Sequence, residues 1–492
     1  MRNENPFLGA AYVARSPNLA DNRLVNLYAE GVPNDAGGKD VAGFFRCPGV
    51  DVLETLTGQT GALVRGLWVL KDYCFAVCGS GFFRVDSDFN STLVGSVSGD
   101  GMVSMDDNGT QLFVACNPDG YIYDYDAETL TQITDPDFLG AVTVGYLAGS
   151  FLYNVPDSQV VQYTAINDGT DIDALDFFSV EGLPDYVRAV FIDHGEAWMF
   201  GDVSIQIYAA SDSTDNPYQN IQGAFIEQGC AAAFSIAKLD NSLFWLGKNK
   251  QGQGVVYRAN GYIPVPVSTR AIEYAISQWP SLSDAIAYSY LQDGHGFYVL
   301  TSPSGDETWA YDVTTGWWHQ RAYLDPDTGE LQRHRSTCHA LFNGVHVVGY
   351  NGEGLTNSGK LLELSLEVYD DDGASQKWLR SWRALPTGQN QLQRTFQHQL
   401  QIDGQTGTGL ATGQGDDPTV LLRWSDDGGH TWSNYHVLYV GQIGATGTRV
   451  IARRLGSTEK LRDRVYELSG TDPVPVMWNA AVLQATGARM GT

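Results

Sequence analysis

One short stretch near the carboxyl end carries polar residues at a spacing that fixes a turn. Ser425, Asp427, Gly429, Thr431 and Trp432 match the pattern Ser-x-Asp-x-Gly-x-Thr-Trp, known as an Asp box. An Asp side chain accepts hydrogen bonds from backbone N–H groups in such a loop, and a glycine there adopts a positive φ. We therefore predict that these five residues form a structural hairpin turn whose chemistry is hydrogen bonding within the loop.

The histidines closest to one another in sequence are His334, His339 and His346. The Asn343-Gly344 dipeptide predicts a type I′ hairpin, which places His339 and His346 on neighbouring strands and lets them share a face. A metal site needs three or four converging ligands, and no third ligand is evident. Cys338 precedes His339, but adjacent strand residues point to opposite faces, which argues against a thiol–histidine pair. We expect no metal site.

Other catalytic signatures are missing from the sequence. It contains no Gly-x-Ser-x-Gly elbow and no P-loop. Six cysteines in 492 residues are too few for a disulfide scaffold, so we expect reduced thiols, with Cys74 and Cys78 on one face of a strand. We expect no enzyme activity and no cofactor.

The charge balance excludes a protein that binds nucleic acid through a broad basic face. The chain carries 30 Lys and Arg against 57 Asp and Glu, a formal net charge of −27, whereas phosphate binding depends on Lys and Arg. A hydrophobic fraction of 43% with 12% aromatic residues indicates a globular core. No run approaches the roughly 18 apolar residues of a membrane span, and no signal-peptide run follows Met1. We expect no membrane span and synthesis in a reducing cytoplasm.

A repeated pattern of short strands predicts the architecture. An apolar strand, a polar turn and a second apolar strand are followed by another turn and a third strand, as in Val144 to Leu147, Ser150 to Asn154 and Val160 to Tyr163. Seven copies start about 40 to 50 residues apart, which is the spacing of propeller blades. The convincing helix candidate is Ser268 to Gln278.

The ends of the chain do not fit this repeat. We therefore predict an all-β fold with a propeller of about seven blades over residues 61–369. A second, β-sandwich-like platform domain is expected from an N-terminal segment, residues 1–60, and a C-terminal part, residues 370–492. Two chain ends that meet in one domain make the propeller an insertion, which domains tolerate.

Two further groups of residues have more than one interpretation. Basic residues gather near the C-terminus and could contact phosphate locally, line a solvated strand edge or form salt bridges at a subunit interface: Arg449, Arg453, Arg454, Lys460, Arg462 and Arg464. The aromatic pair Trp317-Trp318 is a candidate for contact with another subunit or for packing between blades.

Several segments, in order along nearly the whole chain, resemble the packaged-DNA stabilisation family, the tail-hub or nozzle proteins of short-tailed bacteriophages. The early segments are Arg15 to Pro17, Asn22 to Glu30 and Cys47 to Val50. The middle ones are Ala197 to Gly201, Gly223 to Cys230, Lys238 to Gly247 and Val256 to Arg258. The late ones are Trp424 to Trp432, Arg453 to Gly456, Arg462 to Leu468 and Thr471 to Pro475.

This resemblance implies a structural virion protein, made in the host cytoplasm and located in the phage tail. It implies a homo-hexameric ring below the portal and the head-to-tail adaptor protein. Such a ring extends the channel for double-stranded DNA, retains the packaged genome and supports tail spikes or fibres and a tail needle or plug protein. A chain that stays monomeric until the adaptor ring gathers it is also open, because strong like charge keeps free subunits apart.

The Asp box also resembles the boxes that sialidases carry in several copies, so a glycan-binding or glycan-cleaving propeller is the alternative function. In that family the box is a folding element far from the active site, and a catalytic member also has an arginine cluster for the substrate carboxylate. This chain carries one box, and nothing singles out a carboxylate pair for glycoside hydrolysis among its 57 acids.

Overall fold

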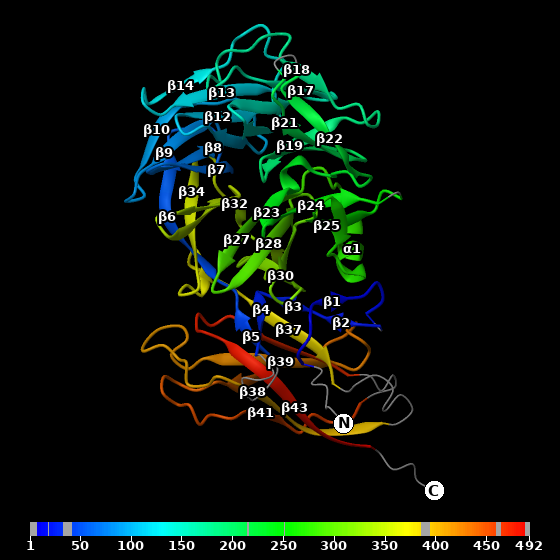
Figure 1. Cartoon of the computed structure of the whole chain (residues 1–492). Coiled ribbons are helices and arrows are strands. Elements are labelled where there is room, and N and C mark those ends of the chain that lie inside the picture. Colours follow the sequence, from blue (N-terminus) through cyan, green and yellow to red (C-terminus); the bar gives the residue numbers. More distant parts are fainter. Residues whose placement is uncertain are drawn as a thin grey trace.

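Antiparallel hairpins build most of the chain. The computed structural model describes residues 7–17, 19–32, 42–213, 216–249, 251–384, 394–458 and 464–487. Figure 1 shows a propeller at one end of the molecule and a smaller β structure at the other. We call the smaller part the platform; it consists of strands β3 to β5 and β37 to β43. The predicted all-β class, with a propeller and a sandwich, is confirmed.

The first five blades are four-stranded antiparallel sheets in which consecutive strands are neighbours. Blade one contains β7 (Val64–Leu70), β8 (Tyr73–Cys78), β9 (Gly81–Val85) and β10 (Ser91–Ser96), and blade two β11 (Ser104–Asp107), β12 (Gln111–Cys116), β13 (Asp119–Asp124) and β14 (Thr129–Gln132). Blade three contains β15 (Val144–Leu147), β16 (Ser150–Asn154), β17 (Val160–Tyr163) and β18 (Phe177–Ser179). Blade four contains β19 (Val187–Asp193), β20 (Glu196–Gly201), β21 (Ile205–Ala210) and β22 (Tyr218–Ile226), and blade five β23 (Ala237–Leu239), β24 (Ser242–Lys248), β25 (Gly254–Asn260) and β26 (Ile263–Pro266).

The last two blades are tied to the chain ends. Blade six contains β27 (Ile286–Gln292), β28 (His295–Ser302), β29 (Glu307–Asp312) and β30 (Trp317–Leu324), with β31 (Leu331–Arg333) paired to β30. Blade seven contains β32 (Ser336–Phe342), β33 (Val345–Tyr350), β34 (Ser358–Ser365) and, as its fourth strand, β6 (Gly49–Thr57). The short strands β35 (Asp370–Asp371) and β36 (Ala374–Ser375) extend the same sheet beyond β6.

The position of β6 corrects one detail of the predicted segments. Residues 49–57 fall in the predicted N-terminal platform segment, yet they pair with β34 from Ser358↔Thr57 to Ser365↔Gly49 (Figure 1). The ring of blades is thus closed by a strand from the start of the chain. The strand was missed because its partner lies about 300 residues away, and a local pattern carries no information on such a pairing.

Local turn and cap chemistry explains the elements that were predicted well. Asn343 and Gly344 both have positive φ, 51° and 78°, as the hairpin between β32 and β33 requires. The helix α1 (Arg270–Ser277) begins after Thr269, whose side chain accepts a hydrogen bond from Ile272 N, and it buries Ala271, Ile272 and Ile276. This short helix lies within the predicted 268–278. Among the described residues, no helix is long and apolar enough to cross a membrane.

The platform consists of two sheets packed face to face. One contains β3 (Leu24–Val25), β37 (Trp378–Arg383), β42 (Val465–Gly470), β39 (Thr419–Ser425) and β40 (His436–Tyr439), and it continues into blade six because β3 pairs with β30. The other contains β4 (Leu27–Gly31), β5 (Ala42–Arg46), β43 (Met477–Gly487), β38 (Thr395–Gly404) and β41 (Val450–Arg453). A two-stranded ribbon, β1 (Tyr12–Val13) and β2 (Asp21–Asn22), lies beside them.

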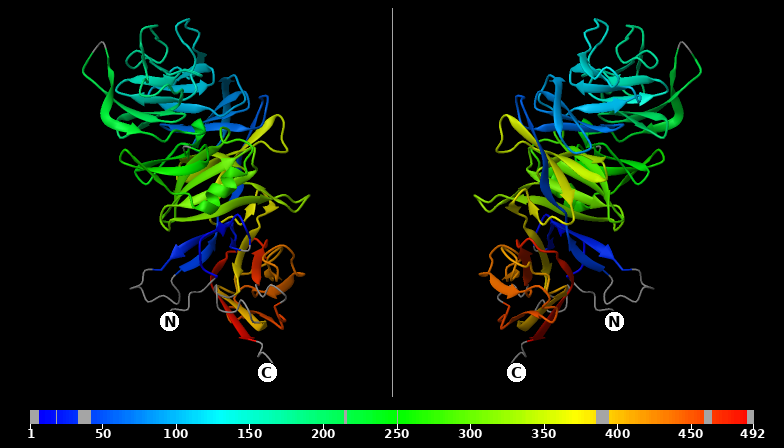
Figure 2. Two further views of the ribbon diagram at one scale, coloured as in Figure 1. Left: turned by 90° about the vertical axis from the view of Figure 1, so that its right-hand side faces the viewer. Right: turned by 90° about the vertical axis from the view of Figure 1, so that its left-hand side faces the viewer.

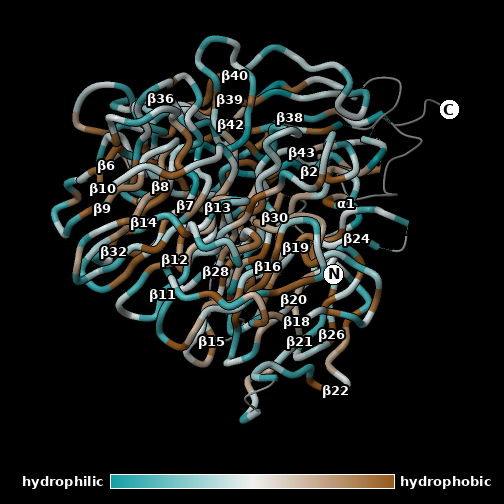
Figure 3. Tube along the Cα trace, turned by 90° about the horizontal axis from the view of Figure 1, so that it is seen from above, coloured by the Kyte–Doolittle hydropathy of each residue, from teal (hydrophilic) through white to brown (hydrophobic). Residues whose placement is uncertain are grey.

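The platform is built from both ends of the chain, as Figure 2 shows by the blue strands lying beside the orange and red ones. One hydrophobic cluster continues from blades five and six into the platform and includes Phe244, Trp318, Trp378 and Trp478. Seen from above, the apolar segments lie mainly inside the molecule and the hydrophilic ones in the peripheral loops (Figure 3). The six cysteines are unpaired; five are buried and Cys338 is half-buried.

Candidate functional site

A buried polar chain in blades six and seven has the residue types of a catalytic dyad. His334 Nδ1 lies 2.7 Å from Ser336 Oγ, which lies 2.7 Å from Tyr288 Oη. Arg321 Nη2 lies 3.1 Å from His334 Nε2. Arginine only donates, so Nε2 accepts, and the backbone N–H of Ser336 points at Nδ1 from 3.3 Å. Burial, with Arg321 and Arg335 nearby, holds the pKa of His334 well below its usual range. His334 therefore cannot take a proton from Ser336, and the hydroxyl is not activated as a nucleophile.

The predicted histidine pair does form. His339 Nε2 and His346 Nδ1 lie 2.9 Å apart on the two strands of the Asn343-Gly344 hairpin, and both rings approach Tyr290. Burial lowers the pKa of His339 to about 3 and lowers that of His346, so the pair is neutral at pH 7. Within the described part of the chain, no three His, Cys, Asp or Glu side chains are placed to hold a metal ion.

Two cavities lie along the inner strands of the propeller. The larger, about 580 Å³, is lined by residues of β7, β11, β15, β19, β27 and β32 and includes Arg65, Asp106 and Lys238. The smaller, about 360 Å³, shares Met102, Phe234, Ile286 and Thr337 with it and reaches Arg333 and Asp284. Basic and acidic groups are mixed along both, so neither has the arginine cluster that a catalytic sialidase needs for its substrate carboxylate.

The Asp-box residues lie together in the loop between β39 and β40. Asp427 Oδ1 accepts hydrogen bonds from Thr431 N at 2.8 Å and His430 N at 3.0 Å, and Asp427 Oδ2 accepts one from Thr431 Oγ1 at 2.7 Å. Ser425 Oγ is 2.6 Å from Asp427 Oδ1 and accepts from Gly429 N, whose φ is 102°. These donors hold the pKa of Asp427 well below its ordinary value. All of these hydrogen bonds to the Asp427 carboxylate come from residues of the Asp box itself, and this loop belongs to the platform.

The aromatic pair packs inside the molecule. Trp318 is buried and donates from Nε1 to Val267 O at 2.9 Å, while the half-buried Trp317 packs 6.4 Å from Phe44 of β5. The pair therefore packs blade six against its neighbours and against the platform.

The C-terminal basic residues that the structure describes have separate surroundings. Arg464 is buried and holds Asp426 with two bonds of 2.7 Å, and Arg449 donates to Gln401. Arg453 and Arg454 are exposed at the end of β41. Lys460 and Arg462 lie outside the described residues.

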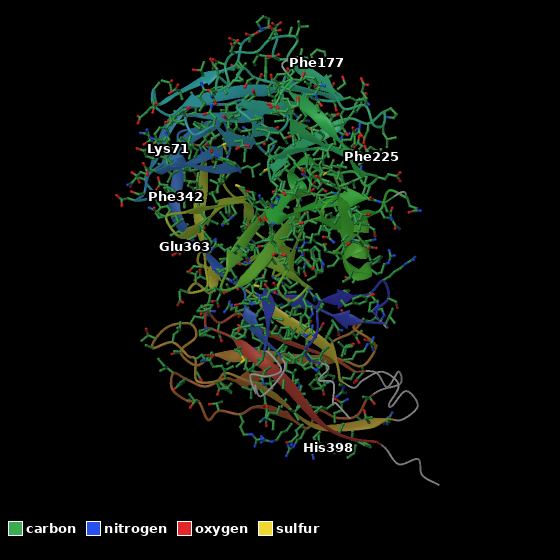
Figure 4. All side chains as sticks on the ribbon, viewed as in Figure 1. Lys71, Phe177, Phe225, Phe342, Glu363 and His398 are labelled. Atoms are coloured by element: carbon green, nitrogen blue, oxygen red, sulfur yellow. The ribbon has the colours of Figure 1, made fainter. Side chains whose placement is uncertain are left out.

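Two surface features were not found from the sequence. Residues 101–187, which span blades two and three, contain 15 Asp and Glu and no Lys or Arg. These blades lie at the end farthest from the platform, where Figure 4 labels Phe177. In the platform, Tyr435, Val437 and Tyr439 are exposed on alternate positions of β40 and the residue before it. Alternation of exposed apolar residues was a usable signal, but a strand pattern does not reveal which face is covered.

Comparison with solved structures finds chains of low similarity. A chain of the computationally designed Ika8 protein is 10% identical, covers 64% of this chain and 100% of its own, with a TM-score of 0.39. A chain from a Saccharomyces cerevisiae complex of Dbp5 with Nup159, Gle1, IP6 and ADP is 9% identical over 64% and 95%, with a TM-score of 0.40. A chain of the Mitotic Checkpoint Complex is 11% identical over 68% and 96%, with a TM-score of 0.42. No curated protein matches the chain.

Two protein-family models match most of the chain. Residues 5–359 match the model described as Bacteriophage P22 Gp10, beta-propeller, and residues 378–486 match Bacteriophage P22 Gp10, beta-sandwich. The first match contains the platform strands β3 to β5 and the blades up to the start of β34, and the second covers most of β37 to β43. The chain belongs to the Bacteriophage P22 Gp10 family of phage stabilisation proteins, structural components of the virion tail.

Proposed function

We propose that six copies of this chain form a ring below the portal and adaptor rings of a short-tailed phage. The ring extends the DNA channel, helps to retain the packaged genome and supports tail spikes or fibres and a needle or plug at the tip. The observation that carries the proposal is that matches to one family of phage stabilisation proteins span residues 5–359 and 378–486.

The charge distribution supports a passage along which DNA slides. A net charge of −27 per copy, concentrated in blades two and three, repels phosphate. Screening restricts this repulsion to about 8 Å at physiological salt, so only carboxylates close to the duplex matter. An acidic wall keeps DNA from adhering during ejection.

The glycan-cleaving alternative has less support. Its sequence basis was the Asp box, whose hydrogen bonds remain within a platform loop. His334, which adjoins the smaller propeller cavity, has a pKa well below its usual range because it is buried, so it is too weak a base to activate Ser336 as a nucleophile.

The proposal is tested by a cryo-electron microscopy map of the infectious particle's tail. The expected result is six copies of the propeller and platform around the axial passage, between the adaptor ring and the tip. Copies located away from the axis, or a symmetry other than six, would contradict it. Particles assembled without the chain should lose their DNA to nuclease, and intact DNA in such particles would contradict the retention role.

A further inference from the structure

We propose that neighbouring copies bind through two opposite faces of the platform. Face one of each copy binds face two of the next copy, so every copy takes part in two contacts. Face one is the outward side of β39 and β40 with Tyr435, Val437 and Tyr439. Face two is the outward side of β38 and β43 with Phe396 and Val482. This inference rests on the proposed ring of copies and states which surfaces close it.

Face one has the composition of an interaction surface. Val437 and Tyr439 are 52% and 60% exposed, whereas Leu438 between them is buried. Arg423 stands over the rings of Trp432 and Tyr435, at 4.6 and 4.9 Å. Tyrosine, tryptophan and arginine are the residues enriched at binding hot spots. In the described part of the chain β40 forms a ladder only with β39, and β41 of the second sheet lies close to it.

Face two lies on the second sheet. Val482 is 57% exposed and Phe396 is 44% exposed, although both belong to long central strands. Around them are side-chain amides and a hydroxyl: Gln399 donates to Gln484 at 2.7 Å, and His398 lies 2.9 Å from Thr486 Oγ1. Figure 4 labels His398 at the end of the molecule opposite the propeller. Apolar side chains within a polar rim are the usual anatomy of a protein interface.

The two faces point in opposite directions. The inner sides of their sheets share one core, in which Leu422 and Leu438 of the first sheet and Leu400 and Ile402 of the second are buried. Trp378 and Trp478 meet across that core with ring centroids 6.2 Å apart. A contact that closes a ring is heterologous, which means that it requires two different patches on opposite flanks of each copy. A second copy of the chain is therefore the occupant that fits both faces.

Charge at the rims of the faces is complementary. Asp416 and Asp417 are exposed. They lie beside face one, since the residues that follow them, Pro418 and Thr419, pair with Val440 and Tyr439 at the end of β40. Beside face two, Arg453 pairs with Gln399 along β41, and Arg449 donates to Gln401. Among the described residues, neither Asp416, Asp417 nor Arg453 forms an ion pair, so these charges are available to a neighbouring copy. Opposite charges at a rim set the register and speed association.

The test uses three variants of the full chain. Val437→Glu places a charge on face one, and Val482→Glu places one on face two. Leu341→Glu is the matched control, because Leu341 in blade seven is also 57% exposed. Circular dichroism and thermal melting establish that each variant is folded. Native mass spectrometry of each chain, and of a one-to-one mixture of the two face variants, gives the oligomeric state.

The wild type and Leu341→Glu are expected to form rings, and each face variant is expected to be monomeric. The mixture should give a heterodimer and nothing larger, because the intact face one of one variant can bind the intact face two of the other. Rings formed by either face variant, or a mixture that stays monomeric, would overturn this inference while leaving the ring itself. A loss confined to Val437→Glu would indicate a symmetric contact of face one with itself and would also overturn it. A wild-type chain that stays monomeric would overturn the inference that these faces bind each other unaided. The proposed ring is contradicted by the tail map and not by this result, because a ring gathered only on the adaptor also gives free monomers.

Discussion

The side-chain amide of Asn26 exchanges two hydrogen bonds with the backbone of Ala322. Asn26 Nδ2 donates to Ala322 O at 2.7 Å, and Ala322 N donates to Asn26 Oδ1 at 2.9 Å. Nδ2 also donates to Lys377 O at 2.8 Å. The Asn26 side chain thus extends the hydrogen bonding of β3 by one residue, to β30 of blade six on one side and to the residue before β37 of the platform on the other. It joins propeller and platform through a fully buried polar group.

Replacing Asn26 with alanine should therefore destabilise the junction. The change removes the partners of Ala322 N–H and of the carbonyls of Ala322 and Lys377, at about 1–3 kcal/mol for each group left buried and unpaired. Asn26 also has a φ of 50°, a conformation that Asn tolerates better than Ala. Calorimetry should show a lower melting temperature, with the platform unfolding before the propeller. A single transition at the wild-type temperature would contradict this role.

The hydrogen bonds of Asn26 join segments far apart in the chain, and such pairings could not be predicted from the sequence. Strands of blade three matched the predicted residues because alternation and Gly or Asp turns are local signals. The fourth strands of the blades, such as β18, went unpredicted because one side faces solvent and the apolar signal is weak. The parallel pairing of Val25 with Gln320 and the closing strand β6 join residues about 300 positions apart. Both termini were nevertheless expected in one platform, because neither fitted the repeat.

Candidate sites formed by residues close in sequence could be predicted, and those formed by distant residues could not. The Asp-box turn and the hairpin around Asn343 depend on neighbouring residues, so spacing was sufficient to place their side chains together. Arg321 lies in β30 and His334 between β31 and β32, and no spacing rule relates them to Tyr288. Which side of β40 is left open is decided by the packing of the whole platform.

Replacing Asp427 with alanine should lower the melting temperature, because the Asp-box loop loses acceptors for two backbone N–H groups and two hydroxyls. The pKa of Asp427 is depressed in the folded chain, so its stabilising contribution is complete above about pH 3.9, the carboxyl's ordinary value. That contribution declines as the pH falls further. The difference in melting temperature between wild type and variant should therefore shrink below pH 4. Asp417→Ala, which removes an exposed platform carboxylate, is the control; a difference that does not change with pH would contradict the assignment.

Replacing His319 with phenylalanine should flatten the acid side of the stability curve. Burial and the neighbouring Arg321 lower the pKa of His319 to about 3. The unfolded chain binds a proton at this position below about pH 6.5 and the folded chain does not, so stability falls as the pH decreases from 6.5 toward 3. The loss is about 1.4 kcal/mol per pH unit for this residue. Denaturant melts at pH 7 and pH 5 measure it, and an unchanged slope in the variant would contradict a neutral buried ring.

Reversing acidic charge on blades two and three should slow genome ejection. Asp126, Asp171 and Glu181 are exposed, so lysine at all three positions changes the surface without disturbing the core. Lysines near the duplex gain affinity for phosphate by releasing counterions. Ejection triggered in vitro and followed by a DNA-binding dye gives the rate. The triple change to Asn, Asn and Gln removes the charge without adding affinity and is the control. Equal rates for lysine variant and wild type would show that these carboxylates do not face the DNA.

Replacing Gly49 with alanine should weaken the closure of the propeller ring. Gly49 begins β6, and its N–H donates to Val368 O at 2.9 Å. An added Cβ would lie 2.7 Å from Val368 O and closer still to Asp370 O, and backbone atoms held in a sheet cannot move away cheaply. Overpacking of this kind costs about 1–3 kcal/mol. Gly31→Ala is the matched control, because a Cβ there meets no atom within 4 Å. Gly49→Ala should lower the melting temperature and raise amide hydrogen exchange in β6 and β34, whereas Gly31→Ala should leave both unchanged. If exchange rises uniformly over all seven blades instead, β6 does not act as a local closing strand.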